Sequence, residues 1–122
     1  MELTKSEMQI MDVLWEAKQP LSRADLLEHA QDKAWKDSSV HILLNGLLAK
    51  NAIYEAGFVK RSKTYGRIFC PSMSREEYFA ATNFSHRYQP DIVGLFAALL
   101  KREDILPEQL DAMERLLEQR RE

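Results

Sequence analysis

Three short stretches in the first fifty residues carry apolar positions at helical spacing. Thr4 and Glu7 form a capping-box pattern, in which each side chain accepts a backbone hydrogen bond from the other residue, and it predicts a helix to about Ala17. Ser22 and Asp25 predict the start of a second helix in the same way. The predicted inward positions are Met8, Met11, Leu14 and Trp15 in the first helix and Ala24, Leu27 and Ala30 in the second.

The third stretch, residues 37–51, predicts a helix with two different faces. Asp37 or Ser38 can cap its start, and Asn51 can close it in the left-handed conformation. The predicted buried face is Val40, Leu43, Leu44 and Leu47, and the outward face of small or hydrogen-bonding residues is Ser39, His41, Asn45 and Gly46. This pattern fits a DNA recognition helix, and an ordinary amphipathic helix has the same pattern.

The periodicity changes after residue 51. Residues 53–60 and 65–69 are rich in β-branched and aromatic side chains, and the polar residues 61–64 lie between them, which predicts a β-hairpin. Because a lone hairpin is marginal in water, some of its apolar residues must pack on the helices, and the candidates are Ile53, Phe58, Ile68 and Phe69. Three helices followed by a hairpin predict a winged helix-turn-helix over residues 1–71.

Residues 72–122 predict a second, helical region. Ser74 and Glu77 form a capping box, residues 88–90 break the helix that follows, and Asp91 can cap an apolar segment at 92–100. Pro107 opens a last helix, with Leu110, Met113, Leu116 and Leu117 on one face. The predicted fold class is therefore mainly α with a small β wing, an N-terminal winged helix-turn-helix plus a C-terminal helical dimerisation region.

The apolar surface of this second region exceeds what about fifty residues can cover alone. We therefore expect a homodimer, with Phe96, Leu99 and Leu100 near the centre of its interface. The predicted interface residues are Tyr78, Phe79, Phe96, Leu99, Leu100, Leu110, Met113 and Leu117. The alternative is that these helices fold back on the N-terminal domain of the same chain.

Composition and charge are those of an ordinary globular domain. Hydrophobic residues make up 45% and charged residues 30% of the 122 residues, and no apolar run reaches the ~20 residues of a membrane span. The start lacks a signal-peptide pattern and Cys70 has no partner for an intrachain disulfide, so a cytoplasmic location is expected. The net charge is −2, but Lys60, Arg61, Lys63 and Arg67 cluster in the hairpin, where a local positive field can serve DNA binding.

The chain resembles the penicillinase-repressor family, the BlaI/MecI/CopY type, over nearly its whole length. The matching motifs are Leu3-Thr4-x-Ser6-Glu7-x-x-Ile10-Met11-x-Val13-Leu14-Trp15, Trp35-x-x-Ser38-Ser39-Val40-x-x-Leu43-Leu44-Asn45-x-Leu47 and Pro71-x-x-Ser74-Arg75-Glu76-Glu77-Tyr78. The resemblance implies a transcriptional repressor that binds double-stranded palindromic operators as a homodimer. It also implies DNA-binding positions, which are Ser38, Ser39, His41, Ile42 and Asn45 in the helix and Arg61, Lys63 and Arg67 in the wing.

Two departures from the family pattern concern induction. Members that answer β-lactams are cut at an Asn-Phe bond in the dimerisation region, and Ala98-Leu99 stands at that place here. Copper-responsive members carry Cys-x-Cys motifs near the C-terminus, and residues 116–122 have none. The inducing signal is therefore open.

Each site residue also has a plainer interpretation. Ser38 and Ser39 can hold a phosphate at the helix N-terminus or simply cap the helix. Ser39, His41 and Asn45 are candidates for base contacts, and Asn bonds adenine bidentately, although His41 can also be a surface histidine. Arg61, Lys63 and Arg67 can contact phosphates or the minor groove or form a solvated hairpin tip. Cys70 can sense oxidants or act as a small buried hydrophobe.

Other functions receive less support from the residues. No metal-ligand spacing joins His29, His41, His86 and Cys70, and no nucleophile–base set stands out, so we expect no metal, no cofactor and no catalysis. Two alternatives remain open. One is a winged helix that docks on a partner protein, and the other is a small-molecule sensor with a pocket among Tyr78, Phe79, Phe84 and Phe96.

Overall fold

The computed structural model describes residues 2–29, 35–61, 64–83 and 91–122 of the chain. The chain divides into two units, residues 1–85 and 86–122, which are described separately. The described part is mainly helical with one small antiparallel sheet, as predicted for a winged helix with C-terminal helices. The elements are α1 (Lys5–Ala17), β1 (Leu21–Ser22), α2 (Arg23–His29), the 3₁₀ turn η1 (Asp37–Ser39), α3 (Val40–Ala49), β2 (Ile53–Arg61), β3 (Thr64–Pro71), α4 (Arg75–Asn83), α5 (Ile92–Leu100) and α6 (Pro107–Arg121).

The first helix forms as the sequence predicts. Glu7 N–H donates to Thr4 Oγ1 at 3.2 Å and Thr4 N–H donates to Glu7 Oε1 at 2.9 Å, so both halves of the capping box are present. Met11 and Leu14 are buried as predicted, whereas the predicted Met8 is only half-buried and Ile10, which was not predicted, is fully buried. The helix ends at Ala17, as predicted, because Lys18 takes the left-handed conformation with φ 54°.

The second helix is capped as predicted but buries a different residue. Asp25 N–H donates to Ser22 Oγ at 3.2 Å and Ser22 N–H donates to Asp25 Oδ2 at 2.9 Å. Leu26 is fully buried, whereas the predicted Ala24 and Leu27 are only half-buried. Ala30 lies outside the described residues. The buried face of α2 therefore differs from the predicted one, and a strand that was not predicted, β1, leads directly into this helix.

The third helix has the predicted buried face and a different start. Val40, Leu44 and Leu47 are buried and Leu43 is half-buried. The 3₁₀ turn η1 precedes α3, and the N-cap residues are Lys36 for η1 and Ser39 for α3, so neither of the predicted residues, Asp37 or Ser38, occupies the N-cap position. At the other end Asn51 has φ 59°, and its N–H bonds Leu48 O while Ala52 N–H bonds Leu47 O. This pair of bonds satisfies the last carbonyls of the helix, as predicted for Asn51.

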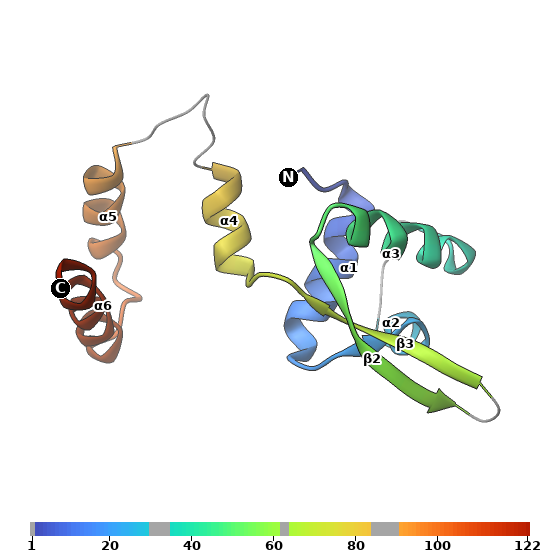
Figure 1. The fold of residues 1–122 in the computed structure, drawn as a ribbon. Helices are drawn as coiled ribbons and strands as arrows, with labels where there is room; N and C mark the ends of the chain where they lie inside the picture. The colour runs from blue at the N-terminus through green and yellow to red at the C-terminus, as the bar shows by residue number, and fades with distance from the viewer. Residues whose placement is uncertain (1, 30–34, 62–63, 84–90) are drawn as a thin grey trace. The chain divides into compact units, whose positions relative to one another are not determined.

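The hairpin joins a three-stranded antiparallel sheet of order β1-β3-β2. Leu21 pairs with Phe69, and a bulge between Glu55 and Gly57 is permitted by the positive φ of Gly57, 141°. Ile53 and Phe69 pack in the core as predicted, and Ile68 is half-buried. Phe58 is 65% exposed, so its predicted candidacy for the core is wrong. Beyond the bulge, the outer half of the hairpin projects away from the helices (Figure 1).

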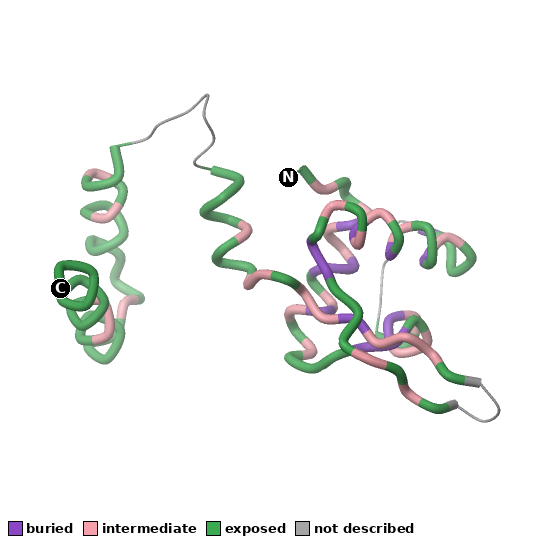
Figure 2. Tube along the Cα trace, in the orientation of Figure 1, coloured by how far each residue is buried: buried purple, intermediate pink, exposed green. Residues whose placement is uncertain are grey.

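The core of the first unit lies where α1, α2, α3 and the base of the hairpin meet (Figure 2). Trp35 is buried in it. Trp15 is half-buried at its edge, where its Nε1 donates to Met73 O at 2.8 Å. The ring of Trp15 also faces Tyr78 of α4, with 6.0 Å between ring centroids.

Helix α4 packs against α1 inside the first unit. Its predicted capping box forms, because Glu77 N–H donates to Ser74 Oγ at 3.0 Å and Ser74 N–H donates to Glu77 Oε1 at 3.1 Å. Arg75 lies over the Trp15 ring, 5.3 Å from its centroid, and forms ion pairs with two acidic residues of α1, Asp12 and Glu16. The boundary between the two units therefore falls after α4, whereas the predicted domain boundary lies between residues 71 and 72.

The second unit consists of α5 and α6. Asp91 occupies the N-cap position of α5 as predicted but makes no side-chain capping bond. Pro107 opens α6 as predicted, and Leu106 N–H donates to Gln109 Oε1 at 2.8 Å in its first turn. None of residues 91–122 is buried. The predicted helix break at residues 88–90 and Phe84 lie outside the described residues.

Candidate nucleic-acid interface

The outward stripe of α3 is formed by residues three or four apart along the chain. Ser38 in η1 and His41, Ile42 and Asn45 in α3 are exposed, and Ser39 is half-buried. Their spacing places them on successive turns of one side. Ile42 is 63% exposed although it is apolar, and such a side chain can contact a thymine methyl group. The stripe thus combines polar groups with one apolar group on a helix that Val40, Leu44 and Leu47 hold against the core.

Gly46 does not belong to this stripe, which corrects the sequence prediction. A Cβ atom at Gly46 would lie 3.0 Å from Glu7 Oε2, so this residue faces α1 and not solvent. Its neighbour Asn45 remains exposed. The sequence pattern missed this because a glycine in a helix carries no side chain whose polarity reveals its surroundings.

Of the three wing residues predicted to bind DNA, the structure describes the side chain of Arg67. Arg67 Nη1 bonds Glu55 Oε1 across the sheet at 2.7 Å, and the guanidinium lies 5.2 Å from the centroid of the Phe69 ring. Arg61 is the last residue of β2, and Lys63 lies outside the described residues. A phosphate that binds Arg67 must therefore displace the carboxylate of Glu55 or share the guanidinium with it.

Three basic side chains from different elements line one hollow of about 390 Å³ between α2, α3 and β3. They are Arg23 of α2, His41 of α3 and Arg67 of β3, and the apolar part of the lining comes from Ala24, Leu27, Leu44 and Phe69. The structure thus brings His41 and Arg67 together. Arg23 was not among the DNA-binding residues predicted from the sequence. Its position could have indicated a function, because a cation in the first turn of a helix interacts unfavourably with the helix dipole.

Cys70 lies beside Tyr54 in the sheet, away from this hollow. The two residues are paired across β2 and β3, and a hydrogen bond with the Cys70 side chain raises the pKa of Tyr54. Cys70 is half-buried. Its surroundings are those of a small sheet residue, and the prediction that it senses oxidants stays untested.

The three helices, the small sheet and the projecting hairpin define a winged helix-turn-helix protein. The model of the family described as penicillinase repressor matches residues 3–119. The chain therefore belongs to the penicillinase repressor family, whose members are transcriptional repressors and not enzymes. A search among curated proteins gave no match.

Among the described residues, no group of three His, Cys, Asp or Glu side chains is placed to hold a metal ion. Within the same part of the chain, every helix is too short or too polar to cross a bilayer.

Proposed function

We propose that the protein is a homodimeric repressor that reads a palindromic operator with α3. The observation that carries this proposal is the outward stripe of Ser38, His41, Ile42 and Asn45 on a helix whose opposite side is buried. An α-helix fits the major groove, where each base pair presents a distinct pattern of donors, acceptors and methyl groups. We infer that Ser39, His41 and Asn45 contact bases and that Ser38 contacts a phosphate.

The wing and α2 supply the sequence-independent part of binding in this proposal. Arg61, Lys63 and Arg67 contact the phosphate backbone or the minor groove, and we add Arg23 to them because it lines the same hollow as His41 and Arg67. Phosphate contacts fix the position of a protein on the duplex and release counterions, so affinity falls as the salt concentration rises.

The dimer half of the proposal rests on α5 and α6. Their predicted interface residues, Phe96, Leu99, Leu100, Leu110, Met113 and Leu117, are all half-buried or exposed within the single chain. A second copy that covers them would set two recognition helices about one DNA turn, or a multiple of it, apart. Tyr78 and Phe79 complete the predicted set, although Tyr78 already packs on Trp15.

Selection of bound duplexes from a random DNA pool tests the proposal. The purified full chain should recover a palindrome with two equal half-sites. The Asn45→Ala variant should recover a consensus that is relaxed at one position in each half-site. Gln19→Ala, which changes an exposed polar residue outside the predicted DNA-binding set, should recover the original consensus. An unchanged consensus from Asn45→Ala would overturn the base-reading role of that residue.

Two observations favour a second candidate function, docking on a partner protein. Phe58 and Tyr65 of the wing are 65% and 68% exposed, and the chain has a net charge of −2. This alternative predicts no consensus and no salt-dependent binding to any duplex at low salt, from protein that is folded and dimeric. The residues proposed for a small-molecule pocket are divided between the two units, because Tyr78 and Phe79 belong to the first and Phe96 to the second.

A further inference from the structure

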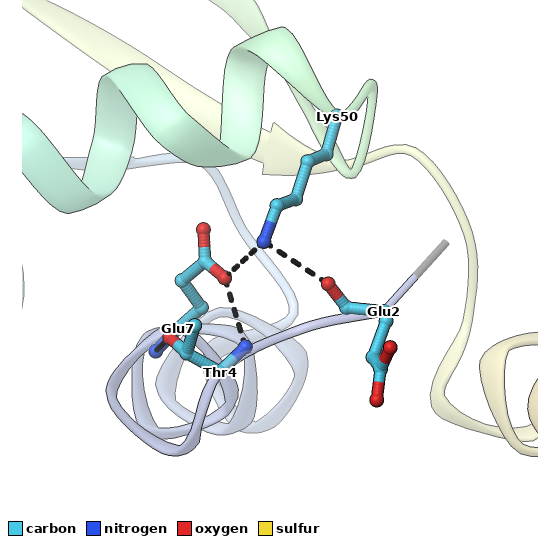
Figure 3. A network of polar contacts seen from close by, with 4 residues as sticks. All are labelled: Glu2, Thr4, Glu7 and Lys50. Carbon is cyan, nitrogen blue, oxygen red and sulfur yellow. Dashed lines mark hydrogen bonds and ion pairs between the residues drawn. The ribbon is translucent and has the colours of Figure 1, made fainter.

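The start of α1 and the end of α3 are joined by a polar network (Figure 3). Lys50 Nζ donates to Glu7 Oε1 at 2.6 Å and to the backbone carbonyl of Glu2 at 3.0 Å. The same Glu7 oxygen accepts the Thr4 N–H at 2.9 Å. The Glu7 side chain is only 5% exposed, against 36% for Lys50. The network is therefore an ion pair with a buried carboxylate between two helices.

Gly46 makes room for that carboxylate. Its place on α3 faces Glu7, and a Cβ atom there would approach Glu7 Oε2 to 3.0 Å. Glycine destabilises the interior of a helix relative to alanine, so a glycine in the middle of α3 calls for a packing reason. The close approach of Glu7 supplies one. Three separate parts of the chain, at residues 4–7, 46 and 50, thus fit one another.

The carboxylate at the centre of the network is ionised at neutral pH. Burial by itself raises the pKa of Glu7, but the hydrogen bond from Lys50 and those with Thr4 outweigh it, and the net pKa lies below its usual value. A buried carboxylate held by a cation requires a defined geometry, whereas the apolar contacts between α1 and α3 tolerate small rotations.

We propose that Glu7, Gly46 and Lys50 are positioning residues that set the rotation and axial position of α3 for base reading. The proposal rests on the DNA-binding function proposed above. Asn45 immediately precedes Gly46 and is exposed, while Gly46 faces α1. A rotation of α3 that relaxes the contact with Glu7 therefore moves Asn45 relative to the rest of the domain. Glu7 itself is buried and acts only through α3.

The test compares Lys50→Met and the double variant Glu7→Gln/Lys50→Met with the parent chain. The first leaves the buried carboxylate without its cation, whereas the second removes the charge as well and is expected to regain stability. For both variants, the ratio of affinities for the selected operator and for a scrambled duplex should fall about tenfold, the scale of one lost base contact. The salt dependence should stay unchanged, because no phosphate contact is lost. Lys101→Met, which changes an exposed lysine of the second unit, is the matched control.

A second readout does not use DNA. Residual dipolar couplings of the free protein should show α3 reoriented relative to α1 in both variants and unchanged in the control. A double variant that is stable, keeps the parent couplings and keeps the parent ratio would overturn the positioning role alone. A parent chain that prefers no duplex would overturn the proposed function and, with it, the base-reading role of the network. A change in the couplings would still show that the network orients α3.

Discussion

Helices α3 and α5 are similar in length, but the more apolar of the two is the more exposed. Every residue of α5 is apolar or glycine, whereas α3 includes His41 and Asn45. Yet α3 buries Val40, Leu44 and Leu47, while Val93 of α5 is 78% exposed. The difference shows that burial follows from the surfaces available to a helix and not from its composition. For α3, those surfaces are α1, α2 and the base of the sheet.

Helix α5 therefore presents apolar area that its own unit does not cover. A contiguous apolar surface of this kind marks an interaction site in a natural protein. This supports the proposed homodimer, in which the second copy takes the part for α5 that α1 and the sheet take for α3. Truncating one leucine in each helix tests this difference between α3 and α5.

Truncation in α3 should have the largest effect. Leu44→Ala should lower the free energy of unfolding of the first unit by roughly 2–5 kcal/mol, because Leu44 is 1% exposed and leaves a cavity. Denaturant unfolding followed by tryptophan fluorescence measures it, since Trp15 and Trp35 both lie in this unit. Ile42→Ala on the exposed side of the same helix is the control and should change the value by less than about 0.5 kcal/mol. Equal losses of unfolding free energy in the two variants would contradict the assignment of Leu44 to the buried side and Ile42 to the exposed side of α3.

Truncation in α5 should act on association. Leu99→Ala should weaken the homodimer by about 1.5–3 kcal/mol, the value of burying one leucine side chain, which is roughly a 10- to 150-fold rise in the dissociation constant. Sedimentation equilibrium measures this rise, and Lys101→Ala, an exposed residue at the end of α5, is the control. A parent chain that is monomeric at every concentration would remove the basis of the proposed interface.

Sequence reasoning succeeded where structure depends on residues three or four apart. The capping boxes at Thr4, Ser22 and Ser74 need only two side chains and one turn of backbone, and all three are present. Asn51 closes α3 for the same local reason. The helix and wing order followed from these local signals together with the change of periodicity after residue 51.

Apart from the caps of α3 and α5, the errors lie where a distant segment determines the structure. Strand β1 exists because Leu21 pairs with Phe69, 48 residues later, and no pattern around Leu21 carries that information. Leu26 and Gly46 were misplaced because their surroundings come from other elements. In the site, the outward stripe of α3 was predictable from its periodicity, whereas the partnership of Arg67 with Glu55 needed the register of the sheet.

The two units also differ in their ion pairs. The pairs Lys50–Glu7 and Arg102–Asp104 have the same N–O distance, 2.6 Å, but the first includes a buried carboxylate. Because the folded pKa of Glu7 is lowered from 4.5, its contribution is present above that pH and is lost as the pH falls through the folded value. Glu7→Gln should cost roughly 1–2 kcal/mol at pH 7 and flatten the loss of stability on acidification. Urea unfolding at several pH values measures both, and an acid limb as steep as that of the parent would contradict the linkage.

The smallest effect is expected for Arg102–Asp104. The hydrogen bond from Arg102 lowers the pKa of Asp104, so any contribution of this pair to stability is lost at low pH, as it is for Glu7. Both side chains are more than half exposed, however, and solvent and salt screen such a pair while its ordering costs side-chain entropy. Asp104→Asn should therefore leave the unfolding curve and its pH dependence unchanged within error, at any salt concentration. A clear loss in the dimer that is absent from the Leu99→Ala protein, at a concentration where sedimentation shows that protein to be monomeric, would mean that the second copy covers this turn. The interface would then extend beyond the predicted leucines.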